Sequence, residues 1–196
     1  RMALDEARHS PREMAVVVGS GTGDVDTHRE VAVRLARTEG SRRVSPTVIP
    51  RLMASTVPAN LASVLEATGP SFTAAAACAG GAYNLLLAAG LVESGHVDAA
   101  LAGGVDIADL HFHAGFDAMR VLSHHNDDPA GAARPFDRDR DGFLVGEAGA
   151  VLVLEPLDVA RARGAEVICE IAGYGASADA FHITDPDPTG EPQARA

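Results

Sequence analysis

The chain has 196 residues, of which 46% are hydrophobic and 22% charged, a balance typical of a soluble globular protein. Its net charge of −11 and the lack of a basic stripe argue against nucleic acid as a partner. No apolar run is long enough to cross a bilayer, and two cysteines do not make a disulfide framework. We therefore expect a cytoplasmic protein without membrane insertion.

The first part of the chain alternates strand and helix patterns. Residues 14–18 (MAVVV) predict a buried strand that ends at a glycine-rich turn. Residues 26–38 and 58–67 have the apolar spacing of helices, and residues 71–77 predict a short strand that leads to Cys78. Residue 1 is not Met and the first strand begins only near residue 14, so we expect an internal piece of a larger protein.

The next segments continue the alternation. Residues 79–94 predict a helix that is apolar on nearly every face, which is typical of a buried helix. Residues 97–104 predict a buried strand, residues 107–122 a helical or mixed segment, and residues 123–142 a long polar loop. Residues 148–156 predict another strand.

The last part of the chain predicts a short helix over 157–164 and a strand over 166–175. Strands that are apolar almost throughout, alternating with helices, indicate an α/β fold with a mostly parallel sheet covered on both faces. The sequence shows no internal repeat.

Three polar motifs have ordinary structural interpretations. The glycine turn 19–23 lacks both GxGxxG spacing and the lysine of a phosphate loop, since the chain contains no lysine. Residues 137–142 (DRDRDG) resemble the start of a calcium loop, but Ala148 stands where the bidentate acid belongs, which favours an Arg–Asp network. We predict no metal site at the paired histidines, which are His111 and His113, and His124 and His125.

Cys78 stands at a predicted strand-to-helix junction among alanines and glycines. The free N–H groups and the dipole of a helix N-terminus favour a thiolate, and the same N–H groups can hold the oxygen of a carbonyl under attack. The small neighbours leave room for a thioester. Cys169, in the middle of a predicted strand, fits a packed core thiol. This chemistry leaves Cys78 open between a nucleophile and a buried cysteine.

Residues 69–84 (GPSFTAAAACAGGAYN) resemble the nucleophile segment of the β-ketoacyl-acyl-carrier-protein synthases, or ketosynthases, of the thiolase-like superfamily. Further stretches resemble this family in order and spacing: 16–24, 45–55, 100–106, 116–123, 133–155 and 170–184. The resemblance implies a thiolase-like layered α/β/α/β/α architecture. It implies that residues 1–164 are the N-terminal half, truncated at its start, and that residues 165–196 begin the C-terminal half.

The resemblance also implies an activity and a set of site residues. Cys78 would take an acyl group from the phosphopantetheine of an acyl carrier protein and condense it with malonyl-carrier, in fatty acid or polyketide synthesis, without a metal or other cofactor. Phe143 matches a gating residue, Phe116 a residue near the acyl pocket, Thr22 a position that sets pocket depth, and Thr184 the entry of the pantetheine arm. Residues 45–55 match the dimer contact, in a homodimer or a ketosynthase heterodimer.

The resemblance places two catalytic histidines and a lysine in a second half that this chain lacks, so we expect the chain alone not to condense. A chain-length factor is disfavoured because such partners lack the active cysteine. The nearest alternative enzyme is a thiolase that acts on coenzyme A thioesters. Residues 134–143 and 181–184 resemble the carrier-dependent synthases and so disfavour this alternative. A calcium-binding or scaffold module is the alternative of a different class.

Overall fold

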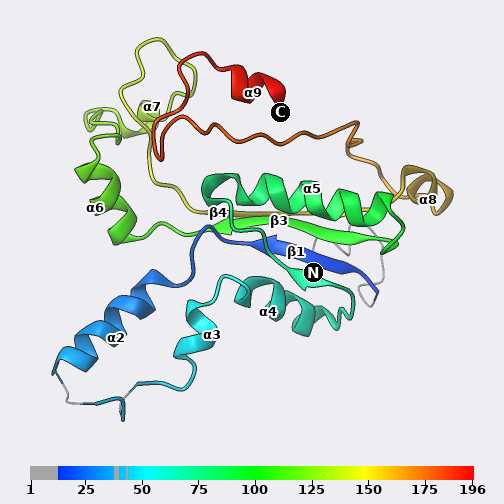
Figure 1. Cartoon of the computed structure of the whole chain (residues 1–196), viewed down its shortest axis with the longest axis horizontal. Coiled ribbons are helices and arrows are strands. Elements are labelled where there is room, and N and C mark those ends of the chain that lie inside the picture. The colour runs from blue at the N-terminus through cyan, green and yellow to red at the C-terminus, as the bar shows by residue number, and fades with distance from the viewer. Residues whose placement is uncertain (1–12, 38–39, 43) are drawn as a thin grey trace.

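The computed structural model describes residues 13–37, 40–42 and 44–196. In these ranges, a four-stranded sheet has the order β2-β1-β3-β4, and helices lie on both of its sides (Figure 1). Strands β1, β2 and β3 are parallel, and β4 runs antiparallel to β3. The strands are β1 (Ala15–Gly19), β2 (Ser71–Phe72), β3 (Ala100–Asp106) and β4 (Ala148–Leu154).

Helices α2, α4, α5, α6 and α8 lie close to the predicted helical segments, whereas α3, α7 and α9 were not predicted. Residues 77–79, part of the predicted strand 71–77 and of the junction after it, instead form a short 3₁₀ turn, because β2 ends already at Phe72. The helices are α2 (Val25–Arg37), α3 (Val48–Leu52), α4 (Thr56–Leu65), η1 (the 3₁₀ turn Ala77–Ala79), α5 (Gly80–Glu93), α6 (Leu110–Ala118), α7 (Pro129–Ala132), α8 (Leu157–Ala162) and α9 (Glu191–Arg195).

Strand β1 is the centre of the core, and each of its residues is buried. Successive side chains of a strand point to opposite faces, so β1 contributes to two apolar clusters. Val16 and Val18 pack with Leu65 and other residues of α4 on one face, while Val17 packs with Ala88 of α5 on the other. The predicted covering of the sheet on both faces is therefore confirmed for β1 and β3.

Helix α5 approaches β3 closely because the contact is made by glycines. A Cβ atom on Gly104 of β3 would lie only 3.2 Å from the Cα atom of Gly81. The expectation that α5 is buried all round is wrong: only Gly80, Asn84, Ala88 and Ala89 are buried along it. One side of the helix packs on the sheet, whereas the other lies under a single extended segment (Figure 1).

That extended segment corrects a second prediction. Residues 166–175 form no strand in the structure, because they lie beyond α5 rather than beside a strand with which they could pair (Figure 1). Tyr174 fastens the segment to α5, since its hydroxyl donates to Glu93 at 2.9 Å, and this bond raises the pKa of Tyr174. Without a covering sheet, Ile168 is 83% exposed, and Cys169 is exposed rather than a core thiol.

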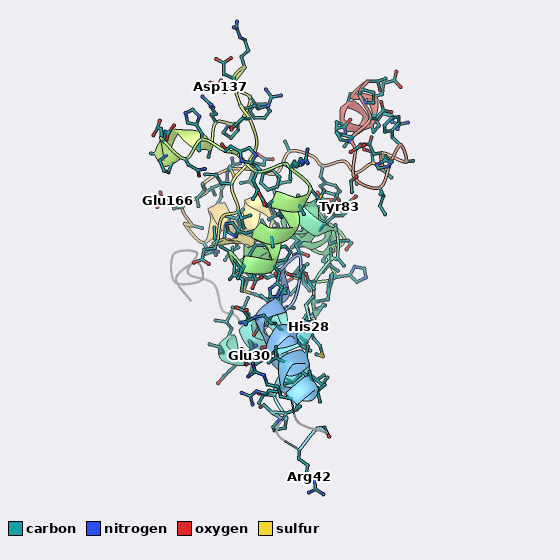
Figure 2. The ribbon with its side chains drawn as sticks, turned by 90° about the vertical axis from the view of Figure 1, so that its left-hand side faces the viewer. His28, Glu30, Arg42, Tyr83, Asp137 and Glu166 are labelled. Atoms are coloured by element: carbon teal, nitrogen blue, oxygen red, sulfur yellow. The ribbon has the colours of Figure 1, made fainter. Side chains whose placement is uncertain are left out.

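Helices α2 and α3 form a lobe that extends away from the sheet, with Arg42 at its outer end (Figure 2). Asp24 joins the two helices, since its carboxylate receives a hydrogen bond from Arg51 at 2.7 Å. It also accepts from the hydroxyl and the backbone of Thr27, and these bonds, followed by Arg51, hold the pKa of Asp24 below its usual value.

Among the described residues, no helix is both long and apolar enough to cross a membrane. Both cysteines are free thiols.

Candidate active site at the junction of β2 and α5

Cys78 lies on the short turn η1, two residues before α5 begins, and its side chain is exposed. The structure thus places the thiol where the sequence predicts it, beside the N-terminus of a long helix. The helix dipole places partial positive charge at this end, which favours a negatively charged sulfur or oxygen atom. The N–H group of Gly80 itself bonds to the carbonyl oxygen of Ala77. An exposed thiol in this position is accessible to a thioester.

The residue before the thiol has an unusual backbone. Ala77 has a φ of +45°, in the left-handed region that residues with a Cβ atom rarely adopt. This conformation turns the chain sharply between the end of β2 and the start of α5. The sharp turn exposes Cys78 instead of burying it under the following helix.

Substitutions at Ala77 provide a test of this strain. We expect Ala77→Gly to raise the free energy of unfolding by up to about 1 kcal/mol, because glycine adopts positive φ without a steric penalty. We expect Ala77→Val to lower it by about 1–2 kcal/mol, because a β-branched side chain tolerates this region least. Chemical denaturation of the three proteins measures both changes, and equal stability of the valine and glycine variants would contradict the strained geometry.

Asn84 is a fully buried polar residue on the sheet-facing side of α5. Its Oδ1 accepts a hydrogen bond from the backbone N–H of Ala74 at 2.8 Å, and its Nδ2 donates to the carbonyl oxygen of Gly103 at 2.9 Å. The sequence analysis did not single out this residue. A lone asparagine among leucines and alanines, six positions after Cys78, is the pattern that could have indicated it.

The glycine turn after β1 lies beside the thiol's turn. Asp106, at the end of β3, accepts from the hydroxyl of Ser20 at 3.0 Å and from the backbone N–H of Gly21 at 3.1 Å. A Cβ atom on Gly21 would lie 3.6 Å from the carbonyl oxygen of Ala77. The structure therefore brings the turn that carries Thr22 next to Ala77. The influence of Thr22 on pocket depth stays a prediction.

Phe116 and Phe143 are far apart in the sequence but in contact in the structure. Their ring centroids are 5.0 Å apart in an edge-to-face arrangement with an interplanar angle of 78°. Phe143 is bridged to the segment after α6, since its N–H donates to Val121 and its carbonyl accepts from Ser123. Phe143 is 44% exposed. Its gating role remains a prediction, and the residue is held both by its backbone bonds and by the ring contact with Phe116.

The Arg–Asp loop is fastened by its last aspartate. Asp141 accepts from the hydroxyl of Ser123 at 2.6 Å and from the N–H of His124 at 2.9 Å, and these bonds, Ser123 first, hold its pKa below the usual value. Asp137 accepts from the N–H of Asp139 within the loop. It lies at the outer end of the loop, away from the sheet (Figure 2). These aspartates bond to hydroxyl and backbone N–H groups of their own part of the chain. The Arg138–Asp139 pair, at 3.8 Å, is highly exposed, so the predicted Arg–Asp network stays a prediction.

A different cluster gathers at the N-termini of α2 and α6. Side-chain atoms of Asp26, Asp109 and His111 lie within 4.8 Å of one another, a juxtaposition that the sequence analysis missed. Asp109 is buried and caps α6, where it accepts from the N–H of His111 at 2.6 Å and contacts its Nδ1 at 2.8 Å. The backbone bond from His111 is the main cause of the lowered pKa of Asp109. Helix capping therefore accounts for this cluster.

Thr184 lies in the exposed C-terminal part of the chain. Its backbone N–H donates to Nδ1 of His182 at 3.2 Å, which makes a local turn. Within the described ranges, no hydrogen bond or ring contact links Thr184 to the other predicted site residues. A role for it at the pantetheine entrance stays a prediction.

A cavity of about 620 Å³ separates α5 from the extended segment and α9. Ala79, Tyr83 and Leu86 line it on the helix side, and Ile171 and Pro192 on the other. Ala79, which follows Cys78 directly in the sequence, lines the cavity, and the lining is mostly apolar.

An exposed thiol at a strained turn between a parallel strand and a helix lies where an α/β fold can present a nucleophile. Residues 1–160 match the family profile of the "Beta-ketoacyl synthase, N-terminal domain". The chain therefore belongs to the β-ketoacyl synthase family, which confirms the resemblance.

Curated relatives and solved structures agree with this assignment. The chain is 41% identical over 194 residues to 3-oxoacyl-[acyl-carrier-protein] synthase 2 of Staphylococcus aureus, a match that covers 98% of the chain and 48% of that protein. It thus spans about half the length of the curated relatives that it matches.

The structural matches confirm the thiolase-like ketosynthase fold class. The ishigamide ketosynthase/chain length factor matches 99% of the chain and 48% of its own length, with a TM-score of 0.84 and 32% identity. A type II polyketide ketosynthase in complex with its acyl carrier protein matches 95% of the chain and 47% of its own length, with a TM-score of 0.83 and 26% identity. Among the residues described, the chain contains one sheet of the layered architecture with its two helical layers.

Proposed function

We propose that the intact protein is a β-ketoacyl-acyl-carrier-protein synthase of fatty acid or polyketide synthesis, with Cys78 as its nucleophile. The observation that carries this proposal is the exposed thiol at the strained turn before α5. The matched relatives are named as such synthases, and one matched structure contains an acyl carrier protein bound to its ketosynthase.

The proposed reaction begins at this thiol and is the one for which the matched relatives are named. The Cys78 thiolate attacks the carbonyl carbon of an acyl thioester on the carrier's phosphopantetheine, the C–S bond to pantetheine breaks, and the pantetheine thiolate leaves and takes up a proton. Malonyl-carrier then loses carbon dioxide, and the resulting carbanion attacks the acyl group on Cys78. A carbon–carbon bond forms, the Cys78 thiolate is released, and the 3-oxoacyl chain remains on the carrier.

The start of α5 and three predicted residues, Thr22, Phe116 and Phe143, would assist this chemistry. The N–H groups at the start of α5 would stabilise the oxyanion of each tetrahedral intermediate. Thr22 would bound the acyl chain beside Cys78, and the Phe116–Phe143 pair would open and close access to it. No metal or redox cofactor is needed, because the phosphopantetheine of the carrier supplies the thioester.

A condensation assay with the intact protein tests the proposal. Acyl-carrier and malonyl-carrier proteins are supplied together, and we expect both the 3-oxoacyl-carrier product and released carbon dioxide. A parallel reaction supplies acyl-coenzyme A and acetyl-coenzyme A instead. Turnover restricted to the coenzyme A thioesters would replace the proposal with a thiolase, and turnover with neither pair would contradict both.

We further propose a homodimer that forms through residues 45–55. On α3 and just after it, Ile49 is 64% exposed and Met53 is 46% exposed, so two large apolar side chains of this segment are accessible to a partner. Sedimentation of the intact protein is expected to show a dimer that Ile49→Asp weakens. An active monomer would rule the dimer out, and co-purification of an unlike ketosynthase subunit would indicate a heterodimer. Two free cysteines favour a cytoplasmic location.

A further inference from the structure

Asn84 connects three parts of the molecule that surround the candidate nucleophile. It lies on α5, accepts from Ala74 in the segment between β2 and the thiol's turn, and donates to Gly103 in β3. Its Nδ2 also lies 3.5 Å from the hydroxyl of Thr73. The side chain is completely buried, so no water competes for these bonds.

The two bonds of Asn84 close the turn that carries Cys78. Strand β2 ends at Phe72, so Ala74 has left the sheet, and the Asn84 amide takes the place of a strand partner for its N–H group. Ala74 precedes Cys78 by four residues, and the turn runs directly into α5, which carries Asn84. Both ends of the segment 74–80 are therefore tied to the same helix, one covalently and one through Asn84.

The strained backbone of Ala77 requires that both ends of this turn be held in place. A left-handed alanine persists only where the surrounding structure holds both sides of it in place. The bond to Gly103 fixes the helix relative to the middle of β3, and the bond to Ala74 fixes the start of the turn relative to the helix. Loss of either bond allows the turn to relax toward an ordinary backbone conformation and to move the sulfur atom.

We propose that Asn84 is a positioning residue, which holds the Cys78 thiol at the N-terminus of α5 by bonding to Ala74 and Gly103 at once. This inference rests on the proposed role of Cys78 as nucleophile. Asn84 does not touch the thiol or a substrate, so it acts through the geometry of the turn. One acceptor and one donor on a side chain of this size are what the site requires.

Two variants separate positioning from simple stabilisation. Asn84→Leu has a similar size but makes neither bond. Asn84→Asp retains the size, and its introduced carboxyl group reproduces both bonds only when protonated, because it then accepts from Ala74 and donates to Gly103. Burial next to a carbonyl oxygen favours that protonated form at mildly acidic pH. Thr27→Val is the matched control, since Thr27 is also buried and hydrogen-bonded but lies in α2, away from the turn.

The measurement is the second-order rate constant for alkylation of Cys78 by iodoacetamide, mapped by mass spectrometry in the intact protein from pH 5.5 to pH 8.5. The rate constant of each variant is divided by that of the unsubstituted protein at the same pH. We expect Asn84→Leu to react roughly tenfold more slowly throughout, because a displaced sulfur loses the helix N–H groups. We expect Asn84→Asp to approach the unsubstituted rate at the acidic end and to fall away from it as pH rises.

The outcomes are distinct. A ratio for Asn84→Asp that does not change with pH would overturn the proposal, as would a Thr27→Val control that slows Cys78 as much as Asn84→Leu does. If Asn84→Leu does not fold, the pH profile of Asn84→Asp decides alone. Failure of the unsubstituted protein to transfer acyl groups to Cys78 would contradict the proposed function itself. Normal transfer, together with Asn84 variants that alkylate at the unsubstituted rate, would contradict only the positioning role.

Discussion

Replacing Cys78 with serine in the intact protein is expected to lower acyl transfer from an acyl carrier by at least about 10⁴-fold. A serine hydroxyl stays protonated near neutral pH and is a far weaker nucleophile than a thiolate, so loss of the thiol removes the covalent step. Loading is measured by incubating the protein with acyl-carrier protein and detecting the acyl adduct by mass spectrometry. The unsubstituted protein should carry the adduct on the peptide that contains Cys78.

Cys169→Ser is the matched control for this experiment. Both thiols are free and exposed, so accessibility alone does not distinguish them. Cys78 lies next to the N-terminus of α5, whereas Cys169 lies within an extended segment, outside any helix. We expect Cys169→Ser to load at the unsubstituted rate, and an adduct on Cys169 in place of Cys78 would overturn the assignment of the nucleophile.

Gly103→Ala is expected to lower the free energy of unfolding by about 3 kcal/mol, the upper part of the range for overpacked sites. The new Cβ atom would lie 2.1 Å from the carbonyl oxygen of Ala150 and 2.9 Å from the Cα atom of Val151. Both are backbone atoms of β4, so no side-chain rotation relieves the contact. The strands β3 and β4 must separate, and the carbonyl that Asn84 binds moves with β3.

Gly115→Ala provides the control for Gly103→Ala. Gly115 lies within α6, and a Cβ atom there would meet no atom within 4 Å. Alanine is the better helix former, so we expect Gly115→Ala to stabilise the protein by up to about 1 kcal/mol. Thermal unfolding followed by circular dichroism compares the two variants. Equal stability would show that β4 does not pack against Gly103 as closely as the structure indicates.

The position of Cys78 could be predicted from the sequence because local patterns determine it. Apolar runs specify β1 and β3, and the run of leucines and alanines after Cys78 specifies α5. A thiol between a strand pattern and a helix pattern must lie near a helix N-terminus, whatever the rest of the fold does. The roles of Thr22, Phe116, Phe143 and Thr184 came instead from the family resemblance, and among them the structure brings the two phenylalanines into contact.

Residues 166–175 show where local patterns are insufficient. Their run of apolar and β-branched residues has the propensity of a strand, but a strand exists only with a neighbour to accept its hydrogen bonds. In the structure they cross above α5 without such a neighbour, so Ile168 and Cys169 are exposed. The pattern therefore determined the extended conformation, and the tertiary arrangement decided that it joins no sheet.

The sequence by itself determined the family, the strands β1, β3 and β4, the helix α5 and the placement of the thiol, since each rests on patterns of residues that are close along the chain. Only the tertiary structure decided the left-handed turn at Ala77, the glycine turn beside it and the burial of Asn84 between α5 and β3. These features depend on which backbone atoms meet across elements distant in sequence. Residue propensities and motif spacing do not specify these contacts, because the contacts form only when the parallel strands and the helix above them pack together.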